Sequence, residues 1–159
     1  IIRQNPELFT ECGGKDHMQL TLLLFLFYEI SLGPDSFWYP FIRAMPTVQF
    51  SCLWTKQEIS TCQDDLISEE LRKYRGEVQA HWKSFKAILQ RYSLIFPSWL
   101  IDVELFNNVY AQVCTRCFCW VGKEITMVPM ADNLNHHSIP MTNESINLDM
   151  HPSGHLNLD

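Results

Sequence analysis

The sequence lacks an apolar run of the about 20 residues that a membrane-spanning helix needs. The apolar stretch from Leu20 to Phe27 is far shorter and predicts a buried helix. A secretory signal peptide is also lacking, and hydrophobic residues make up 47% of the chain, which is enough for a core without disulfides. We therefore expect no membrane association, and a reducing intracellular compartment in which the six cysteines stay free.

The sequence also contains fewer basic than acidic residues. The chain has 12 Lys and Arg against 18 Asp and Glu, a net charge of −6, which argues against nucleic-acid binding as its main activity. An acidic protein can still act on basic protein substrates. Internal repeats are absent as well, and 159 residues correspond to one domain or a large piece of one. Because the chain starts at Ile1 and ends after a polar run at Asp159, we expect it to be an internal piece of a longer protein.

Helical signals fill the first two thirds of the chain. An apolar helix is predicted from His17 to Ile30, followed by a second one around residues 37–42 that Asp35 or Ser36 can cap. The capping box of Thr55 and Glu58 predicts the start of another helix. A longer helix is expected over residues 68–92, since its apolar residues recur every three or four positions. Its apolar stripe comprises Leu71, Tyr74, Val78, Trp82, Phe85, Leu89 and Tyr92.

The last third changes character. Asp102 is expected to cap a helix that runs through Phe118, and the residues from Ile125 to Met130 predict a short strand. From His137 onward the chain is polar, with one weak alternating strand at residues 146–150. The fold class predicted is α+β, with helices dominant and β structure only near the end.

The most informative stretch is residues 127–136, with the sequence MVPMADNLNH. A strand there ends near a proline and is followed within a few residues by Asp132, Asn135 and His136. A carboxylate, an amide and an imidazole at the exit of a strand suit ligand contacts, because loops on a rigid scaffold carry function. An ordinary polar turn after a strand is the alternative.

This stretch resembles the VPMADMLNH segment of SET-domain protein methyltransferases in the branch that includes the RuBisCO large-subunit lysine methyltransferases. Residues 115–118, TRCF, are similar to the family's TRSF or SRAF. Residues 25–46, FLFYEISLGPDSFWYPFIRAMP, resemble its paired helices around SFWYPYI, and Trp54 with the acidic helix after it resembles its W…EEL pattern. The four matches lie in the family's order and span nearly the whole chain.

The resemblance implies methyl transfer from S-adenosylmethionine to a lysine of a protein substrate. It implies that Arg116, Asn135 and His136 bind the cofactor, with the Arg116 guanidinium facing its carboxylate. It further implies that Thr115, Phe118 and Asp132 border the channel that admits the target side chain. The phenylalanine at 118 favours lysine over histidine as the methyl acceptor, because histidine-specific relatives carry a polar residue there.

The same resemblance divides the chain into residues 1–101, a helical inserted region of a SET domain, and residues 102–159, the first part of its C-terminal β portion. It implies a protein partner that presents a lysine, membership of a larger complex, and a nuclear, cytoplasmic or plastid location. The family's glycine-bearing cofactor segment lies upstream of what matches Ile1, and its catalytic tyrosine follows the asparagine-histidine motif. All five tyrosines here precede that motif, so we assign no catalytic residue.

Two other functions are compatible with the sequence. A SET-derived chain without the tyrosine could serve as a non-catalytic binding or scaffold module. A zinc site is the second, because Cys114, Cys117 and Cys119 have a C-x-x-C-x-C spacing and His136 and three further histidines follow. Against zinc, the predicted helix places Cys117 toward the core and the other two cysteines elsewhere. We therefore expect no metal.

Overall fold

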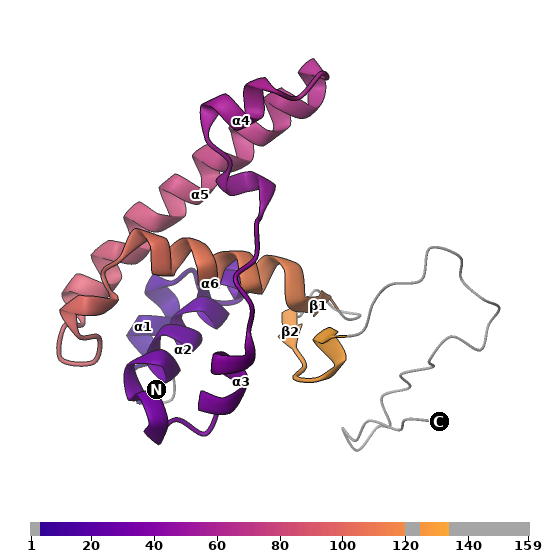
Figure 1. Cartoon of the computed structure of the whole chain (residues 1–159). Helices are drawn as coiled ribbons and strands as arrows, with labels where there is room; N and C mark the ends of the chain where they lie inside the picture. Colours follow the sequence, from indigo (N-terminus) through magenta and orange to yellow (C-terminus); the bar gives the residue numbers. More distant parts are fainter. Residues whose placement is uncertain (1–3, 120–124, 134–159) are drawn as a thin grey trace.

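The computed structural model describes residues 4–119 and 125–133 (Figure 1). In this part the chain is mostly helical and has one two-stranded antiparallel sheet, which confirms α+β in that coarse sense. The elements are α1 (Pro6–Glu11), α2 (Met18–Leu32), α3 (Tyr39–Ala44), α4 (Lys56–Ser60), α5 (Asp65–Arg91), α6 (Val103–Arg116), β1 (Cys117–Cys119) and β2 (Ile125–Met127). Within the described ranges, no helix is both long and apolar enough to span a membrane.

The helix starts follow from local hydrogen bonding. The predicted capping box is confirmed: Thr55 Oγ1 accepts from the Glu58 amide at 3.2 Å, and Glu58 Oε2 accepts from the Thr55 amide at 2.6 Å. Asp102 caps α6 as expected, because its carboxylate accepts from the amides of Glu104 and Leu105 at 2.6 and 3.2 Å. Each side chain satisfies amides that have no partner inside the helix.

Two helices begin at residues other than those predicted from the sequence. The long helix starts at Asp65, three residues earlier than expected, because the Asp64 carboxylate accepts from the Ile67 amide at 3.0 Å. The helix expected around residues 37–42 starts at Tyr39 without a side-chain cap. Ser36, one of the proposed caps, instead accepts from the Trp38 amide at 3.0 Å and donates to the buried Glu29 carboxylate at 2.6 Å.

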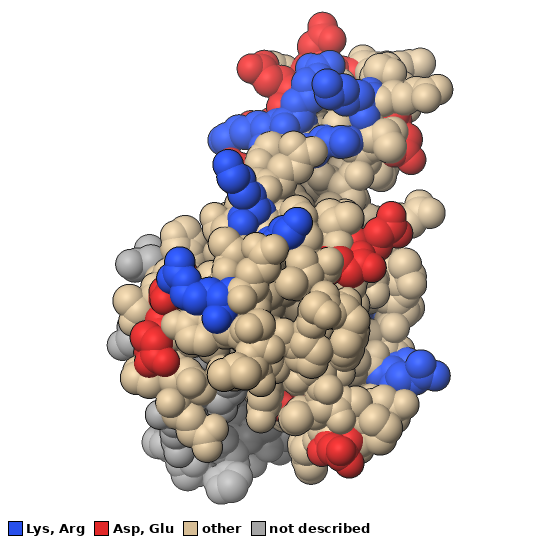
Figure 2. Space-filling model, turned by 90° about the vertical axis from the view of Figure 1, so that its left-hand side faces the viewer, with Lys and Arg blue, Asp and Glu red and all other residues tan. Residues whose placement is uncertain are grey.

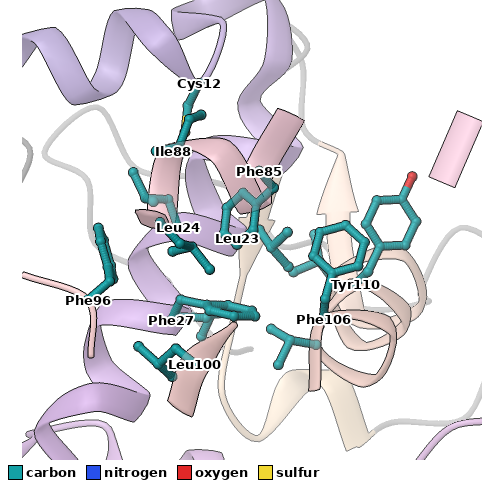
Figure 3. Close-up of a cluster of buried hydrophobic side chains, with 14 of the residues drawn as sticks. Cys12, Leu23, Leu24, Phe27, Phe85, Ile88, Phe96, Leu100, Phe106 and Tyr110 are labelled. Atoms are coloured by element: carbon teal, nitrogen blue, oxygen red, sulfur yellow. The ribbon is translucent and has the colours of Figure 1, made fainter. Parts of the chain in front are cut away.

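The core lies where α2, α5 and α6 meet, and it is built around aromatic rings (Figure 3). Phe27 of α2 meets Phe85 of α5 edge-on at 4.9 Å between ring centroids, and Phe85 lies 5.5 Å from Phe106 of α6. All three rings are at most 1% exposed. Offset and edge-on contacts of this kind are favoured by the ring quadrupoles. The core therefore joins elements from both sides of residue 101, although the predicted division there stays a prediction.

The N-terminal half of α5 projects away from this core together with α4 (Figure 1). We call α4 and residues 65–79 of α5 the arm. Apolar side chains on the arm are exposed: Leu66 by 76%, Ile67 by 54% and Tyr74 by 46%. Tyr74 was predicted as part of the buried stripe, and this was wrong: it lies at the edge of the stripe, about 60° around the helix axis from Leu71, which is buried although it lies farther out on the arm.

The end of α6 also differs from the prediction. The helix stops at Arg116 rather than Phe118, and residues 117–119 form β1. The strand expected over residues 125–130 ends at Met127, and Met130 has a φ of +76° that extended backbone does not adopt. The strand predicted at residues 146–150 lies outside the described residues. These corrections bring a helix end, a strand pair and a turn together at one place.

Candidate functional site

The candidate site is the junction between α6 and the strand pair. β1 and β2 run antiparallel, with Cys117 opposite Met127, Phe118 opposite Thr126 and Cys119 opposite Ile125. Cys117 and Met127 both pack against the hydrophobic core, which anchors the pair to the body. After β2 the chain forms a short helical turn, Ala131–Asn133. The pairing of β1 with β2 therefore brings residues 127–133 close to the TRCF segment, residues 115–118.

A buried ion pair joins the two segments. Arg116 Nη1 donates to Asp132 Oδ2 at 2.6 Å across sixteen residues of sequence. The Asp132 side chain is fully buried and the Arg116 side chain is only 15% exposed. Charge-assisted hydrogen bonds of this length are among the stronger ones in proteins, and the low dielectric around a buried pair strengthens the attraction further.

The second oxygen of the Asp132 carboxylate is one of three buried side-chain oxygens in the described residues that accept no hydrogen bond, and the others belong to the neutral amides of Asn108 and Gln112. Oδ1 is buried, and it accepts no hydrogen bond from the residues that the structure describes. A buried acceptor without a donor costs roughly 1–3 kcal/mol, and more for a charged group. The site therefore offers an acceptor position beside a guanidinium, which suits a ligand that carries N–H groups.

The backbone around Asp132 is held in a tight turn. The Asp132 amide donates to the Val128 carbonyl at 3.2 Å, and Met130 between them adopts the left-handed conformation. A residue other than glycine in this region costs of order 1 kcal/mol, and such strain gathers at functional sites. The Met130 side chain is 79% exposed, so burial of that side chain does not explain the conformation.

The two other predicted substrate residues lie within two positions of Arg116 in the sequence. Thr115 is exposed, and its hydroxyl donates to the Ala111 carbonyl of its own helix at 2.7 Å. Phe118 is half-buried on β1 opposite Thr126. The two predicted cofactor ligands Asn135 and His136 lie outside the described residues. Of the six predicted site residues, the structure thus brings Arg116 and Asp132 into contact and places Thr115 and Phe118 beside Arg116 in the chain.

An apolar pocket that sequence analysis missed lies on the α2 and α3 side of β2. Its volume is about 220 Å³. It is lined by Leu22, Phe25, Leu26, Trp38, Phe41, Ile125, Thr126, Met127 and Pro129. Ligand pockets for whole small molecules usually measure about 300–1,000 Å³, so this one has room for a single side chain or an alkyl group. The aromatic-rich stretch around Trp38 was a signal for it, but only the packing of α3 beside β2 makes a pocket.

The cysteines of the proposed zinc motif are not arranged as predicted. Cys114 lies on α6, as predicted, whereas Cys117 and Cys119 lie on β1, so the helical placement of these two was wrong. Burial raises the pKa of the Cys114 thiol to about 11, and the Gln19 amide donates to its sulfur at 3.2 Å. In residues 4–119 and 125–133, no three His, Cys, Asp or Glu side chains gather as metal ligands.

Comparisons with protein-family models, with curated proteins and with solved structures found no match to this chain. The site must therefore be judged on its own geometry and on the motifs in the sequence.

Proposed function

We propose that this chain is part of an S-adenosylmethionine-dependent protein-lysine N-methyltransferase of the SET-domain type. The observation that carries the proposal is the Arg116–Asp132 ion pair. It joins the TRCF segment to the VPMAD segment, the two stretches whose residues were assigned to cofactor and substrate. A buried charge pair with one unsatisfied acceptor can bind a ligand at that junction. An ordinary polar turn would not require such a pair.

The residues at the junction fit the cofactor. Its amino-acid end carries a carboxylate, which suits the guanidinium fork of Arg116, since one fork can serve two acceptors. Asn135 and His136 would hold the rest of the cofactor, as their motif implies. When bound, the cofactor supplies an electrophilic methyl group on a sulfonium ion. The protein contributes orientation and a preorganised electrostatic environment around it.

Asp132 and Phe118 fit the target lysine. The buried Oδ1 atom of Asp132 can accept an N–H from the target amine and so fix its direction. Phe118 would give the channel an apolar wall, and desolvation there lowers the pKa of a lysine amine, which must be neutral to attack. Thr115 would lie at the mouth of the channel, where its exposure leaves room for the backbone of a protein substrate.

Cofactor binding to the full chain tests the proposal. S-adenosylhomocysteine, the product form, would be titrated into the wild-type chain and into Arg116→Lys by isothermal calorimetry. We expect measurable binding to the wild type and about tenfold weaker binding to Arg116→Lys, because lysine keeps the charge but loses the fork. The matched control is Arg91→Lys, which changes the exposed ion pair with Glu11 and should leave the affinity unchanged.

Two results would contradict the proposal. One is the absence of binding at millimolar ligand by a wild-type chain that melts cooperatively. The other is equal affinity of wild type and Arg116→Lys. Either would favour the alternative of a non-catalytic binding or scaffold module, in which the ion pair only holds the strand pair against α6.

A further inference from the structure

Positive side chains gather on one face of α5 although the protein is acidic overall. Arg72, Arg75, Lys83 and Lys86 follow one another at steps of three, eight and three residues, with Gln79 between the pairs. At 100° per residue these five positions lie within about 80° of one another around the helix axis. Lys56 of α4 lines the same hollow as Arg72 and Arg75, the two cations of this set that lie on the arm. We call Lys56 and these five residues of α5 the basic stripe, and Figure 2 shows the Lys and Arg side chains gathered over the arm.

The stripe includes a groove. A hollow of about 440 Å³ lies between α4 and α5, lined by Lys56, Ile59, Arg72, Arg75, Gly76 and Gln79. Gly76 places no side chain in the groove, and no atom lies within 4 Å of the position that a Cβ would take there. The Arg75 guanidinium donates to the Trp54 carbonyl, which holds that charge at the groove wall.

Among the described residues, the cations of the stripe form no close ion pairs. Within the described residues, Arg91 and Arg116 form ion pairs with carboxylates, whereas no carboxylate lies within 4 Å of the Lys and Arg groups of the stripe. The hydrogen bonds from the amide and hydroxyl of Thr55 lower the pKa of Glu58 on α4, and the charge of Arg75 lowers it further. Glu70 and Glu77 on α5 lie roughly 140–160° around the axis from Arg72, whereas Asp65 and Glu69 lie about 20° and 60° from it, toward the N-terminal end of α5. Like charges held together in this way favour an anionic ligand.

We propose that the basic stripe binds an extended acidic segment of a protein partner. From Arg72 to Lys86 the helix rises about 21 Å, which matches about six residues of extended peptide. Carboxylates on alternate peptide residues can face successive cations along that length. This inference does not depend on methyl transfer.

The surroundings favour a peptide over nucleic acid. The net charge of −6 and the carboxylates of Asp64, Asp65 and Glu69 at the N-terminal end of α5 repel a continuous phosphate backbone. Trp82 is the aromatic side chain of α5 nearest to the stripe, about 20° beyond its edge, and its half-buried ring packs against Phe106, so it offers bases little stacking surface. A peptide of about six residues spans only the stretch from Arg72 to Lys86, so it does not extend to those carboxylates and needs no stacking platform.

Fluorescence anisotropy of a labelled peptide of alternating Glu and Ser tests the proposal. The double variant Arg72→Gln/Lys83→Gln should weaken binding about tenfold relative to wild type at low salt, because two cations of the stripe are lost. The matched control is Arg43→Gln/Lys73→Gln, which removes the same charge from exposed positions off the stripe and should change the affinity less than about twofold. Thermal melting of both variants checks that the fold is retained.

Three results would overturn the proposal. One is an equal loss of affinity in the two double variants, which would mean that only net charge matters. Another is equal binding of a peptide in which Gln replaces Glu. The third is tighter binding of a single-stranded oligonucleotide than of the peptide, which would assign the stripe to nucleic acid.

Discussion

Arg116 Nη1 lies 2.6 Å from Asp132 Oδ2, and the strand pair that separates the two residues in sequence is what brings them together. The contact closes the junction between α6 and the turn after β2. Its charges are nearly excluded from solvent, so the pair affects both stability and binding at that junction.

Removing one partner of this pair should be costly. In Asp132→Ala the nearly buried guanidinium loses the carboxylate at 2.6 Å, and the free energy of unfolding should fall by about 3–5 kcal/mol in urea titration. Arg116→Met should cost a similar amount, and the double variant should cost clearly less than the sum, since the uncompensated charge is then gone. The exposed pair gives the comparison: Arg91→Met, next to Glu11, should cost less than about 1 kcal/mol. Additive losses in the double variant would contradict the coupling.

The cap of α6 should contribute to the same structure. Asp102→Ala removes the acceptor of the Glu104 and Leu105 amides, and it should lower the free energy of unfolding by about 1 kcal/mol. Asp102→Asn is the matched control, because asparagine keeps a side-chain oxygen at the same position and should be nearly neutral. A loss of similar size in both variants would mean that charge rather than capping is responsible.

The ring cluster should be the most sensitive part of the core. Phe27 is fully buried and meets Phe85 edge-on, so Phe27→Ala should cost about 3–5 kcal/mol through lost burial and a residual cavity. The control is Phe37→Ala, since Phe37 is 85% exposed and its loss should change stability by less than about 0.5 kcal/mol. If urea titration gave similar losses in free energy of unfolding for Phe27→Ala and Phe37→Ala, the ring cluster would not be the most sensitive part of the core.

His81 should make stability depend on pH. Burial lowers the pKa of His81 below its usual 6.5, the charge of His17 lowers it further, and Glu77 opposes both. The unfolded chain therefore binds a proton at higher pH than the folded one. The His81 contribution is complete above pH about 6.5, falls as the pH drops through that value, and levels off below the pKa of the folded state.

The variant His81→Gln should remove this dependence. Urea titrations from pH about 7.5 to about 5.5 should show a flatter stability profile for the variant than for wild type. The variant also loses the contact between His81 Nδ1 and the Tyr110 hydroxyl at 3.4 Å, but that loss shifts the whole profile rather than its slope. An unchanged slope would exclude His81 as the group responsible.

The sequence determined the features that depend on neighbouring residues. The Thr55–Glu58 box and the Asp102 cap work within three residues, so a helix start could be predicted from the letters alone. The amphipathic spacing of α5 likewise predicted Val78, Phe85 and Leu89 as buried, because a helix with that stripe must cover it.

Only the tertiary structure decided where those elements stop and what they meet. Cys117 continues α6 in local propensity, yet pairing with Met127 makes it a strand residue. Tyr74 follows the same spacing as the buried residues of its stripe, yet it is 46% exposed while Leu71, one turn farther out, is buried, because the neighbouring elements cover only part of the stripe on the arm. The sequence motifs predicted Arg116 and Asp132 each as a site residue, but they did not predict that the two side chains meet. Their contact follows from the register of β1 and β2, and register depends on cross-strand packing that a single segment does not encode.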